Sequence, residues 1–324
     1  MAVNTKAIKN RIKSVTNTKK ITKAMELVSA AKMRKSVESA LNTRTYATMA
    51  RDLMAHLSGV EDKTKYGLLA TRPVKNILMI LISSNRGLCG SFNSNIARKA
   101  VFALQNKNEL SKHILDSNKE VAPAGEVKVN ILGIGKRSAS LAKREGYELV
   151  GVYNDIEGSK DYEKVISISR NVIKDFEAGN YDKVVVAYTD YKTSLTQEPR
   201  IRQLLPISPR DLDEMLGNLG KNKNSAVVKI KDGTNKFDAG GYLFEPSEES
   251  ILKNILPKLV EVQLYQSVLE SSASEHSARM MAMRNASDAA RDMINELNLT
   301  FNKARQASIT QEIAEIAGGA AALE

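Results

Sequence analysis

The sequence has few of the residues on which metal enzymes and disulfide-bonded proteins depend. It contains one cysteine, Cys89, and no tryptophan in 324 residues. A single cysteine excludes a disulfide within the chain and a cysteine zinc cluster, and it points to a reducing compartment. The three histidines, His56, His113 and His276, lie far apart and show no spacing typical of a metal site. We therefore expect neither a metal enzyme nor a bound cofactor.

Long apolar runs are also absent. The longest is Ile77 to Ile82, far short of the ~20 residues that a helix needs to cross a bilayer. The first 25 residues contain seven Lys or Arg and no acid, which is typical of a mitochondrial presequence. The helical pattern nevertheless continues past residue 25 without a break that resembles a cleavage site. We expect a soluble, unprocessed chain.

Glycine and proline are missing from both ends of the chain. Neither occurs in residues 1–58 or in residues 258–317. Each stretch is about five times the mean helix length of ~11–12 residues. A helix this long cannot bury an apolar stripe against itself, so each predicted helix needs a partner.

The C-terminal stretch shows the apolar stripe of a coiled coil. Alternate steps of four and three residues from Leu269 give Ala273, His276, Met280, Met283, Ser287, Ala290, Ile294, Leu297, Phe301 and Ala304. Only His276 and Ser287 interrupt the stripe over five heptads, which exceeds the three to four heptads that indicate a coiled coil.

The N-terminal stretch carries its apolar residues in separate blocks. These blocks are Ile8, Ile12 and Val15; Ile21, Met25 and Val28; and Tyr46, Met49 and Leu53. The register slips between them, as it does at a stutter in a coiled coil. We expect the two terminal helices to pair as a long antiparallel coiled coil.

The middle of the chain has the pattern of an α/β domain. Short apolar, β-branched runs at 76–83, 127–133 and 183–188 are typical of buried parallel strands. Helices are expected near 94–118, 136–145 and 160–178, and this alternation favours a Rossmann-like sheet. Residues 217–241 are expected to form a surface hairpin or loop, and 242–244 an edge strand. The predicted organisation is a helix over 1–60, an inserted Rossmann-like α/β domain over 75–245 and a helix over 247–324.

Charge is unevenly distributed along the chain. The net charge is +11, yet residues 1–58 alone carry 12 basic and three acidic residues, a net of +9. Residues 258–324 carry six basic and nine acidic residues, a net of −3. The basic segment implies an acidic partner, either a nucleic acid or an acidic protein surface.

Two glycine-rich turns were tested for nucleotide binding and neither fits a phosphate loop. In the turn that starts at Gly133, a Walker A motif needs Gly at 130 and Ser or Thr at 137, where the chain has Asn130 and Arg137. A dinucleotide fingerprint needs a third Gly where Ser138 stands. In the other turn, Cys89 has no nearby histidine to activate it and is interpreted as a buried structural thiol. A self-contained enzyme is disfavoured.

Two terminal segments closely resemble the terminal helices of F-type ATP synthase γ subunits. They read IKSVTNTKKITKAMELVSAAKM at 12–33 and NKARQASITQEIAEIAGGAAA at 302–322. Landmarks between them agree in order, namely RGLCG at 86–90, QLLP at 203–206 and YLFEP at 242–246. The resemblance spans the whole chain and is weakest in 104–126 and 217–240.

The resemblance implies a non-catalytic subunit, present in one copy per complex, that serves as a rotating shaft. Its partners would be three α and three β subunits, the ε subunit and the membrane c ring, with no nucleic acid. Proton flow would turn the ring and the shaft, and the shaft would drive each β subunit through different nucleotide affinities. Membrane association would occur only through the complex.

The resemblance also assigns contact residues. Met25, Arg279 and Arg284 would lie near an acidic lever loop of a β subunit. Four residues would meet a second β loop: Arg305, Gln306, Thr310 and Glu312. Ile309, Ile313 and Ile316 would turn in an apolar collar, and Tyr242 and Glu245 would face the c ring and ε.

Location and rival functions follow from the same features. Chloroplast γ subunits carry a redox-switching cysteine pair, which Cys89 alone cannot form, so the cytoplasmic face of a bacterial cell membrane is favoured. A nucleic-acid-associated coiled coil is the main alternative because the isoelectric point is about 9.5. A nucleotide-binding enzyme with a helical stalk is the third interpretation.

Overall fold

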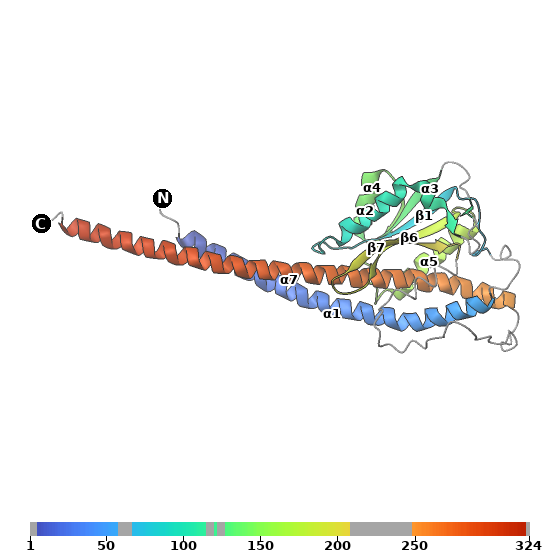
Figure 1. Cartoon of the computed structure of the whole chain (residues 1–324), viewed down its shortest axis with the longest axis horizontal. Coiled ribbons are helices and arrows are strands. Elements are labelled where there is room, and N and C mark those ends of the chain that lie inside the picture. The colour runs from blue at the N-terminus through green and yellow to red at the C-terminus, as the bar shows by residue number, and fades with distance from the viewer. Residues whose placement is uncertain (1–4, 58–66, 115–119, 122–126, 208–247, 322–324) are drawn as a thin grey trace. The chain divides into compact units, whose positions relative to one another are not determined.

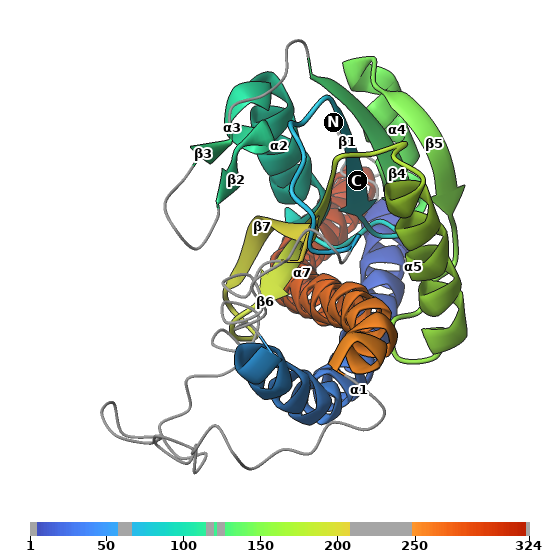
Figure 2. The same ribbon diagram turned by 90° about the vertical axis from the view of Figure 1, so that its right-hand side faces the viewer.

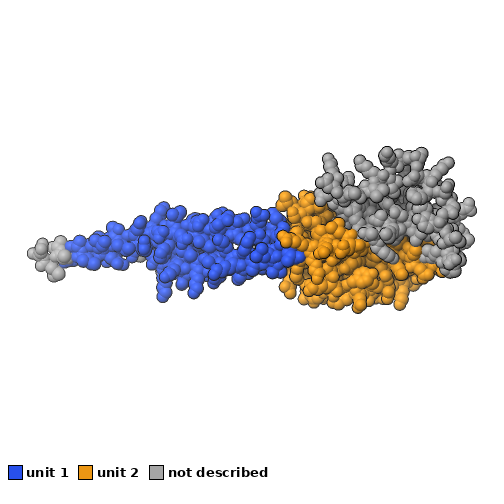
Figure 3. Space-filling model, turned by 90° about the horizontal axis from the view of Figure 1, so that it is seen from below, with its two compact units in different colours: residues 1–31, 279–324 blue, residues 32–278 orange. Residues whose placement is uncertain are grey.

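The computed structural model describes residues 5–57, 67–114, 120–121, 127–207 and 248–321. They divide into two compact units, residues 1–31 with 279–324 and residues 32–278 (Figure 3). Two long helices, α1 (Thr5–Leu57) and α7 (Glu248–Ala321), contribute to both units. The two predicted terminal helices are therefore confirmed.

The second unit is built on a five-stranded sheet with the order β5-β4-β1-β6-β7. Its strands are β1 (Asn76–Ile82), β4 (Lys128–Ile134), β5 (Glu148–Tyr153), β6 (Lys183–Tyr191) and β7 (Gln197–Leu205). The first four are parallel, and β7 pairs antiparallel with β6 at one edge. A separate small hairpin joins β2 (His113–Ile114) to β3 (Glu120–Val121). The expected Rossmann-like parallel sheet is confirmed, with one antiparallel edge strand added.

Helices cover both faces of this sheet (Figures 1 and 2). Ile77 and Met79 of β1 point towards α2 (Phe92–Gln105) and α4 (Lys136–Glu145). Leu78 and Ile80 point the other way, into a core formed with α5 (Tyr162–Glu177) and α7. Neither face of a strand buried on both sides contacts solvent, which explains the continuous apolar run in this strand.

Three details of the middle domain were predicted wrongly or missed. The helix expected over 94–118 ends at Gln105, because Asn106 leaves the helical region at φ −101° and ψ 54°. The short helix α3 (Lys107–Ser111) follows it. Strand β5 was missed because it is an edge strand without a fully buried residue, and β7 because it contains Pro199 and alternates with arginines. The loop predicted at 217–241 and the edge strand predicted at 242–244 lie outside the described residues.

The coiled coil of the first unit runs in one unbroken register along α1, so the expected stutter is wrong. Ile21 and Val28 are 61% and 56% exposed, whereas Thr22 and Ser29 are buried. The buried and half-buried positions follow steps of four and three: Ile8, Ile12, Val15, Lys19, Thr22, Glu26 and Ser29. A hydroxyl pair keeps this register, since the Oγ1 of Thr22 lies 2.7 Å from the Oγ of Ser287. A small polar pair fills the seam where an apolar residue was expected.

The two helices are antiparallel. Thr22 pairs with Ser287 in the first unit, and the Oγ of Ser36 lies 3.1 Å from that of Ser272 in the second. The residue number thus rises on α1 as it falls on α7. The expected antiparallel pairing is confirmed.

Candidate functional site

The C-terminal end of α7 is uncovered over several turns. Seventeen residues separate Thr22 from Thr5 and also Ser287 from Ala304, so the register places Thr5 opposite Ala304. Phe301 and Ala304 are half-buried, and every residue in 305–319 is exposed. Within the described residues of this unit, nothing therefore packs against α7 beyond Ala304.

An apolar stripe lies on this uncovered segment. Ile309, Ile313 and Ile316 are spaced by four and three residues and are 46%, 61% and 74% exposed. Steps of four and three place side chains on one helix face. Three exposed isoleucines in one row are typical of a surface that docks against another protein.

Polar residues of the same segment remain on its surface. Arg305 and Gln306 are exposed, and the hydroxyl of Thr310 donates to the carbonyl of Gln306 at 2.9 Å. The carboxylate of Glu312 accepts a hydrogen bond of 3.4 Å from the hydroxyl of Ser308. All the residues that the sequence singled out between 305 and 316 are thus accessible to a partner.

Three more of the expected contact residues, on α1 and α7, lie in the same unit. Met25 is half-buried, Arg284 is exposed and Arg279 is only 7% exposed. Arg284 therefore offers the more accessible charge. Tyr242 and Glu245, expected near the c ring, lie outside the described residues.

A second exposed apolar face on α1 was not recognised from the sequence. Ile21 and Val28, seven residues apart on one side of the helix, are 61% and 56% exposed, and Leu27 is 61% exposed as well. The signal was present, because the block Ile21–Met25–Val28 does not fit the register of Ile8 and Ile12. The sequence pattern was interpreted as a helix interface with a slip in register, and not as a second face of the helix.

The turn between β4 and α4 does not have the geometry of a phosphate loop. Anion binding at a helix N-terminus requires free backbone amides. The amides of residues 136, 137 and 138 already donate to the Oδ1 of Asn85, the carbonyl of Ser84 and the Oγ of Ser83, at 3.2, 3.3 and 2.8 Å. These contacts fix the turn against the end of β1, so its glycines serve packing.

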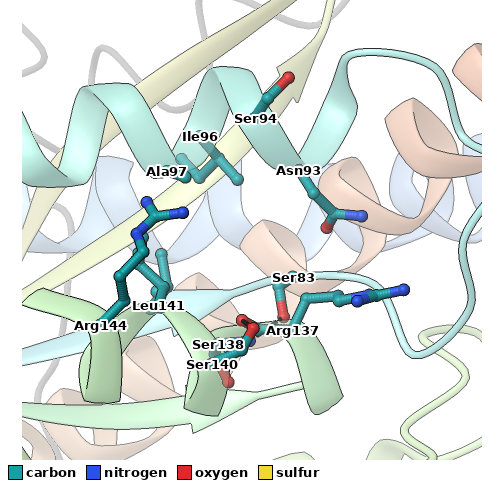
Figure 4. A pocket seen from close by; sticks show the side chains of 11 residues that line it. Ser83, Asn93, Ser94, Ile96, Ala97, Arg137, Ser138, Ser140, Leu141 and Arg144 are labelled. Atoms are coloured by element: carbon teal, nitrogen blue, oxygen red, sulfur yellow. Dashed lines mark hydrogen bonds between the residues drawn. The ribbon is translucent and has the colours of Figure 1, made fainter.

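A cavity of about 170 Å³ lies next to this turn, between α2 and α4 (Figure 4). Asn93 and Ser94 of α2 and Arg137 and Arg144 of α4 line it, and no carboxylate, histidine or cysteine does. The lining serine Ser138 donates its hydroxyl to the carbonyl of Gly135. Nucleophilic catalysis needs a base beside the nucleophile, and this cavity contains none.

Cys89 has the surroundings of a structural thiol. It is 3% exposed, and its sulfur accepts a hydrogen bond of 3.2 Å from the side-chain amide of Asn93. Among the residues that the structure describes, no group of three or more His, Cys, Asp or Glu could hold a metal ion. In the same residues, no helix combines the length and the apolar character needed to span a membrane.

The fold and the uncovered surface define a class: a coiled-coil subunit, anchored on an α/β domain, with a helical end built for docking to other proteins. Comparison with known proteins gives the family. The family model described as "ATP synthase" matches residues 4–323. The chain belongs to the ATP synthase gamma chain family, whose members form the central-stalk rotor of F-type ATP synthases.

Curated relatives align over nearly the full length. The chain is 39% identical to the ATP synthase gamma chain of Roseiflexus castenholzii, over 99% of this chain and 98% of the relative. It is 40% identical to that of Herpetosiphon aurantiacus, over 98% of this chain and 97% of the relative. It is 38% identical to that of Flavobacterium johnsoniae, over 99% of both chains.

Solved structures share the fold. A chain from the mitochondrial ATP synthase of Euglena gracilis (OSCP/F1/c-ring, rotational state 3) has a TM-score of 0.61 at 18% identity. That match covers 98% of this chain and 94% of the other. A chain from the central stalk and c ring of the Tetrahymena thermophila mitochondrial enzyme has a TM-score of 0.55 at 24% identity, over 82% and 99% of the two chains.

Proposed function

We propose that this chain is the shaft that couples proton flow through a membrane c ring to ATP synthesis and hydrolysis in a ring of three α and three β subunits. One copy serves each complex, and ε completes the base of the shaft. The observation that carries the proposal is the uncovered end of α7, where 305–319 are exposed and bear a row of three isoleucines. Such a segment requires a partner collar.

In this proposal the chain is not a catalyst. Rotation presents a different side of an asymmetric coiled coil to each β subunit in turn. A coupling of this kind needs contacts that differ between alternative conformations of the partner. The coiled coil meets that need because, among the described residues, α7 continues alone beyond Ala304, where α1 has ended.

The lower contact joins basic residues to an acidic lever loop of a β subunit. Arg284 is exposed on α7, and residues 1–58 carry a net charge of +9. Met25 contributes a partly accessible apolar side chain beside this charge. Arg279 joins the proposal through the family resemblance alone.

The upper contact uses the uncovered segment. Arg305, Gln306, Thr310 and Glu312 face a second loop of a β subunit. Ile309, Ile313 and Ile316 turn inside an apolar collar, which covers side chains that are 46–74% exposed in the chain by itself. Burial of apolar area supplies affinity without fixing an angle, so such a bearing permits rotation.

The base of the shaft sits on the c ring. We place Tyr242 and Glu245 there, with ε, and we place the complex at the cytoplasmic face of a bacterial cell membrane. The chain contacts the membrane only through the complex. The three-part organisation into 1–60, 75–245 and 247–324 remains part of this proposal.

The test is to co-express a tagged copy of the chain with the proteins of its host and to identify what copurifies. We expect α and β at three each per copy, in a complex that hydrolyses ATP. Purification alone or with nucleic acid would overturn the proposal. In that case the logarithm of the binding constant for nucleic acid should fall linearly with the logarithm of the salt concentration.

A matched pair of arginines tests the assigned contact. Arg305→Ala removes a proposed contact with β, and we expect loss of proton-driven ATP synthesis in the assembled complex. Arg291→Ala removes another exposed arginine, one that pairs with Asp288 of its own helix at 2.9 Å, and it should leave synthesis unchanged. Equal activity of the two variants would remove Arg305 from the contact.

A further inference from the structure

The part of α7 that lies against the sheet is buried on all sides. Every residue in 259–271 is buried, although the stretch contains Glu261, Gln266 and Glu270. Helices buried all round are normally apolar all round. A carboxyl group in such a place is expensive to ionise unless a cation and hydrogen bonds accompany it.

Glu270 lies on the side of α7 that faces β6. It is 3% exposed, and its Oε1 accepts a hydrogen bond of 3.1 Å from the Nε2 of Gln266. One turn further along, the hydroxyl of Ser274 donates to the carbonyl of Thr189 at 3.1 Å. This contact fixes α7 against β6 at the point where β6 carries Asp190, which is fully buried.

Two of the cations near this site pair with Asp190. Its carboxylate lies 2.8 Å from the Nζ of Lys192 and 3.2 Å from the Nε of Arg200. The guanidinium of Arg202 stands over the ring of Tyr188, 5.6 Å from its centre. Among the described residues, none forms an ion pair with Glu270.

Among the described side chains, the other helices that pack here bring no charge to Glu270, since Arg170 of α5 pairs with Glu261 at 3.0 Å. The buried side chains of α1 along this stretch are Ser36 and Ala40. The buried side chains of α5 that join the same core are apolar: Val165, Ile168, Val172, Ile173 and Phe176. Two carboxyl groups therefore share one buried site, in which Lys192 and Arg200 pair with Asp190 and leave Glu270 without an ion pair among the described residues.

These surroundings raise the pKa of Glu270 to about 7. Burial is the largest cause, followed by the negative charge of Asp190. The guanidinium of Arg202 and the hydrogen bond from Gln266 lower this pKa in part. Burial and the neighbouring carboxylate thus hold the pKa of this carboxyl group well above its usual range.

We propose that Glu270 is a proton-binding site at the junction of α7 with β6, and that the junction tightens when it is protonated and loosens when it is ionised. Ionisation places a second negative charge beside Asp190 in a site that water does not reach. The site lies in the contact through which α7 is held on the sheet. The proposal concerns the chain itself and does not depend on its partners.

The first experiment compares the unfolding equilibrium of the full chain with that of Glu270→Gln across pH 5 to 8. The folded state keeps a proton that the unfolded state releases, so stability falls as pH rises from about 4.5 to about 7. Relative to Glu270→Gln, the unfolding constant of the natural chain should rise on the order of 10- to 100-fold over this range. Parallel profiles would overturn the proposal.

Glu157→Gln is the matched control. This glutamate is 48% exposed, and its pKa is lowered to about 2, so it is ionised throughout pH 5 to 8. Its replacement should leave the shape of the pH profile unchanged. A profile flattened by this variant as well would show that the effect is not specific to Glu270.

A second measurement does not depend on the folding of Glu270→Gln. The infrared spectrum of the natural chain at pH 6 should contain one protonated carboxyl band, which titrates near neutrality. Asp190→Asn should move the midpoint of that titration to lower pH, because it removes the neighbouring negative charge. Absence of the band from the natural chain would overturn the proposal.

Discussion

At the scale of single residues, Gly135 shows how a turn can resemble a nucleotide loop and serve packing instead. Its φ is +92°, and a Cβ at this position would overlap the carbonyl oxygen of Ser83. The glycine is therefore required by the close approach of two strand ends. The sequence alone indicated a packing turn here, since the dinucleotide pattern fails at Ser138 and the Walker A pattern at Asn130 and Arg137.

We expect Gly135→Ala to destabilise the chain by about 2 kcal/mol or more. The left-handed backbone alone costs roughly 1–2 kcal/mol for a residue with a Cβ, and the overlap with Ser83 adds to it. Gly318→Ala is the control, because nothing lies within 4 Å of the added Cβ and the glycine is helical. Denaturant unfolding of both variants measures the difference, and equal stabilities would contradict the argument.

Glu157 gives a prediction of pH dependence with the opposite sign to that of Glu270. Hydrogen bonds from Lys32 and Lys160, at 2.8 and 3.2 Å, lower its pKa to about 2. A lowered pKa contributes stability above the unfolded value near 4.5, and this contribution disappears as pH falls towards 2. Because the carboxylate is half exposed, we expect Glu157→Gln to cost only about 1 kcal/mol or less at pH 7. Thermal unfolding at pH 7 and near pH 2 would test this, and a cost that persists at the lower pH would contradict it.

At the scale of elements, α1 carries two apolar faces where the sequence suggested one interrupted stripe. Periodicity alone cannot tell which of two overlapping stripes meets the partner helix. The choice is made by Ser287 on α7, whose hydroxyl pairs with Thr22 and so fixes the register. Ile21 is turned outward as a consequence.

Two isoleucines on α1 test this register. Ile12 is half-buried on the seam, so Ile12→Ala should cost about 1–2 kcal/mol, less than for a fully buried isoleucine. Ile21 is 61% exposed, so Ile21→Ala should change the free energy of unfolding by less than about 0.5 kcal/mol. Denaturant unfolding of the full chain compares them. A larger loss for Ile21→Ala would restore the slipped register.

At the scale of the whole molecule, we propose that stability and function reside in different parts of α7. Residues 259–271 are buried and hold the helix on the sheet, whereas 305–319 are exposed. The chain thus has a long segment that its own fold does not need. We propose that this segment serves the partners of the chain.

Truncation after Ala304 should therefore separate the two properties. We expect the unfolding midpoint of the chain to change little, because the deleted residues are exposed. Assembly with α and β and proton-driven ATP synthesis should weaken strongly. A full-length variant with Ile309→Ser, Ile313→Ser and Ile316→Ser is the control for chain length and should show the same loss. Undiminished synthesis by the truncated chain would contradict the shaft assignment.

The sequence by itself determined the two long helices, the parallel strands between them and the family. These features are local. Each is recognised from neighbouring residues alone, as a heptad pattern, a short β-branched run or a terminal motif. The spacing of Ile309, Ile313 and Ile316 on one helix face was equally apparent from the sequence. Only the tertiary structure decided which stripe of α1 is buried, that 305–319 stand uncovered, and that Glu270 meets Asp190. Each of these depends on residues far apart in the chain, whose pairing is set by packing and burial.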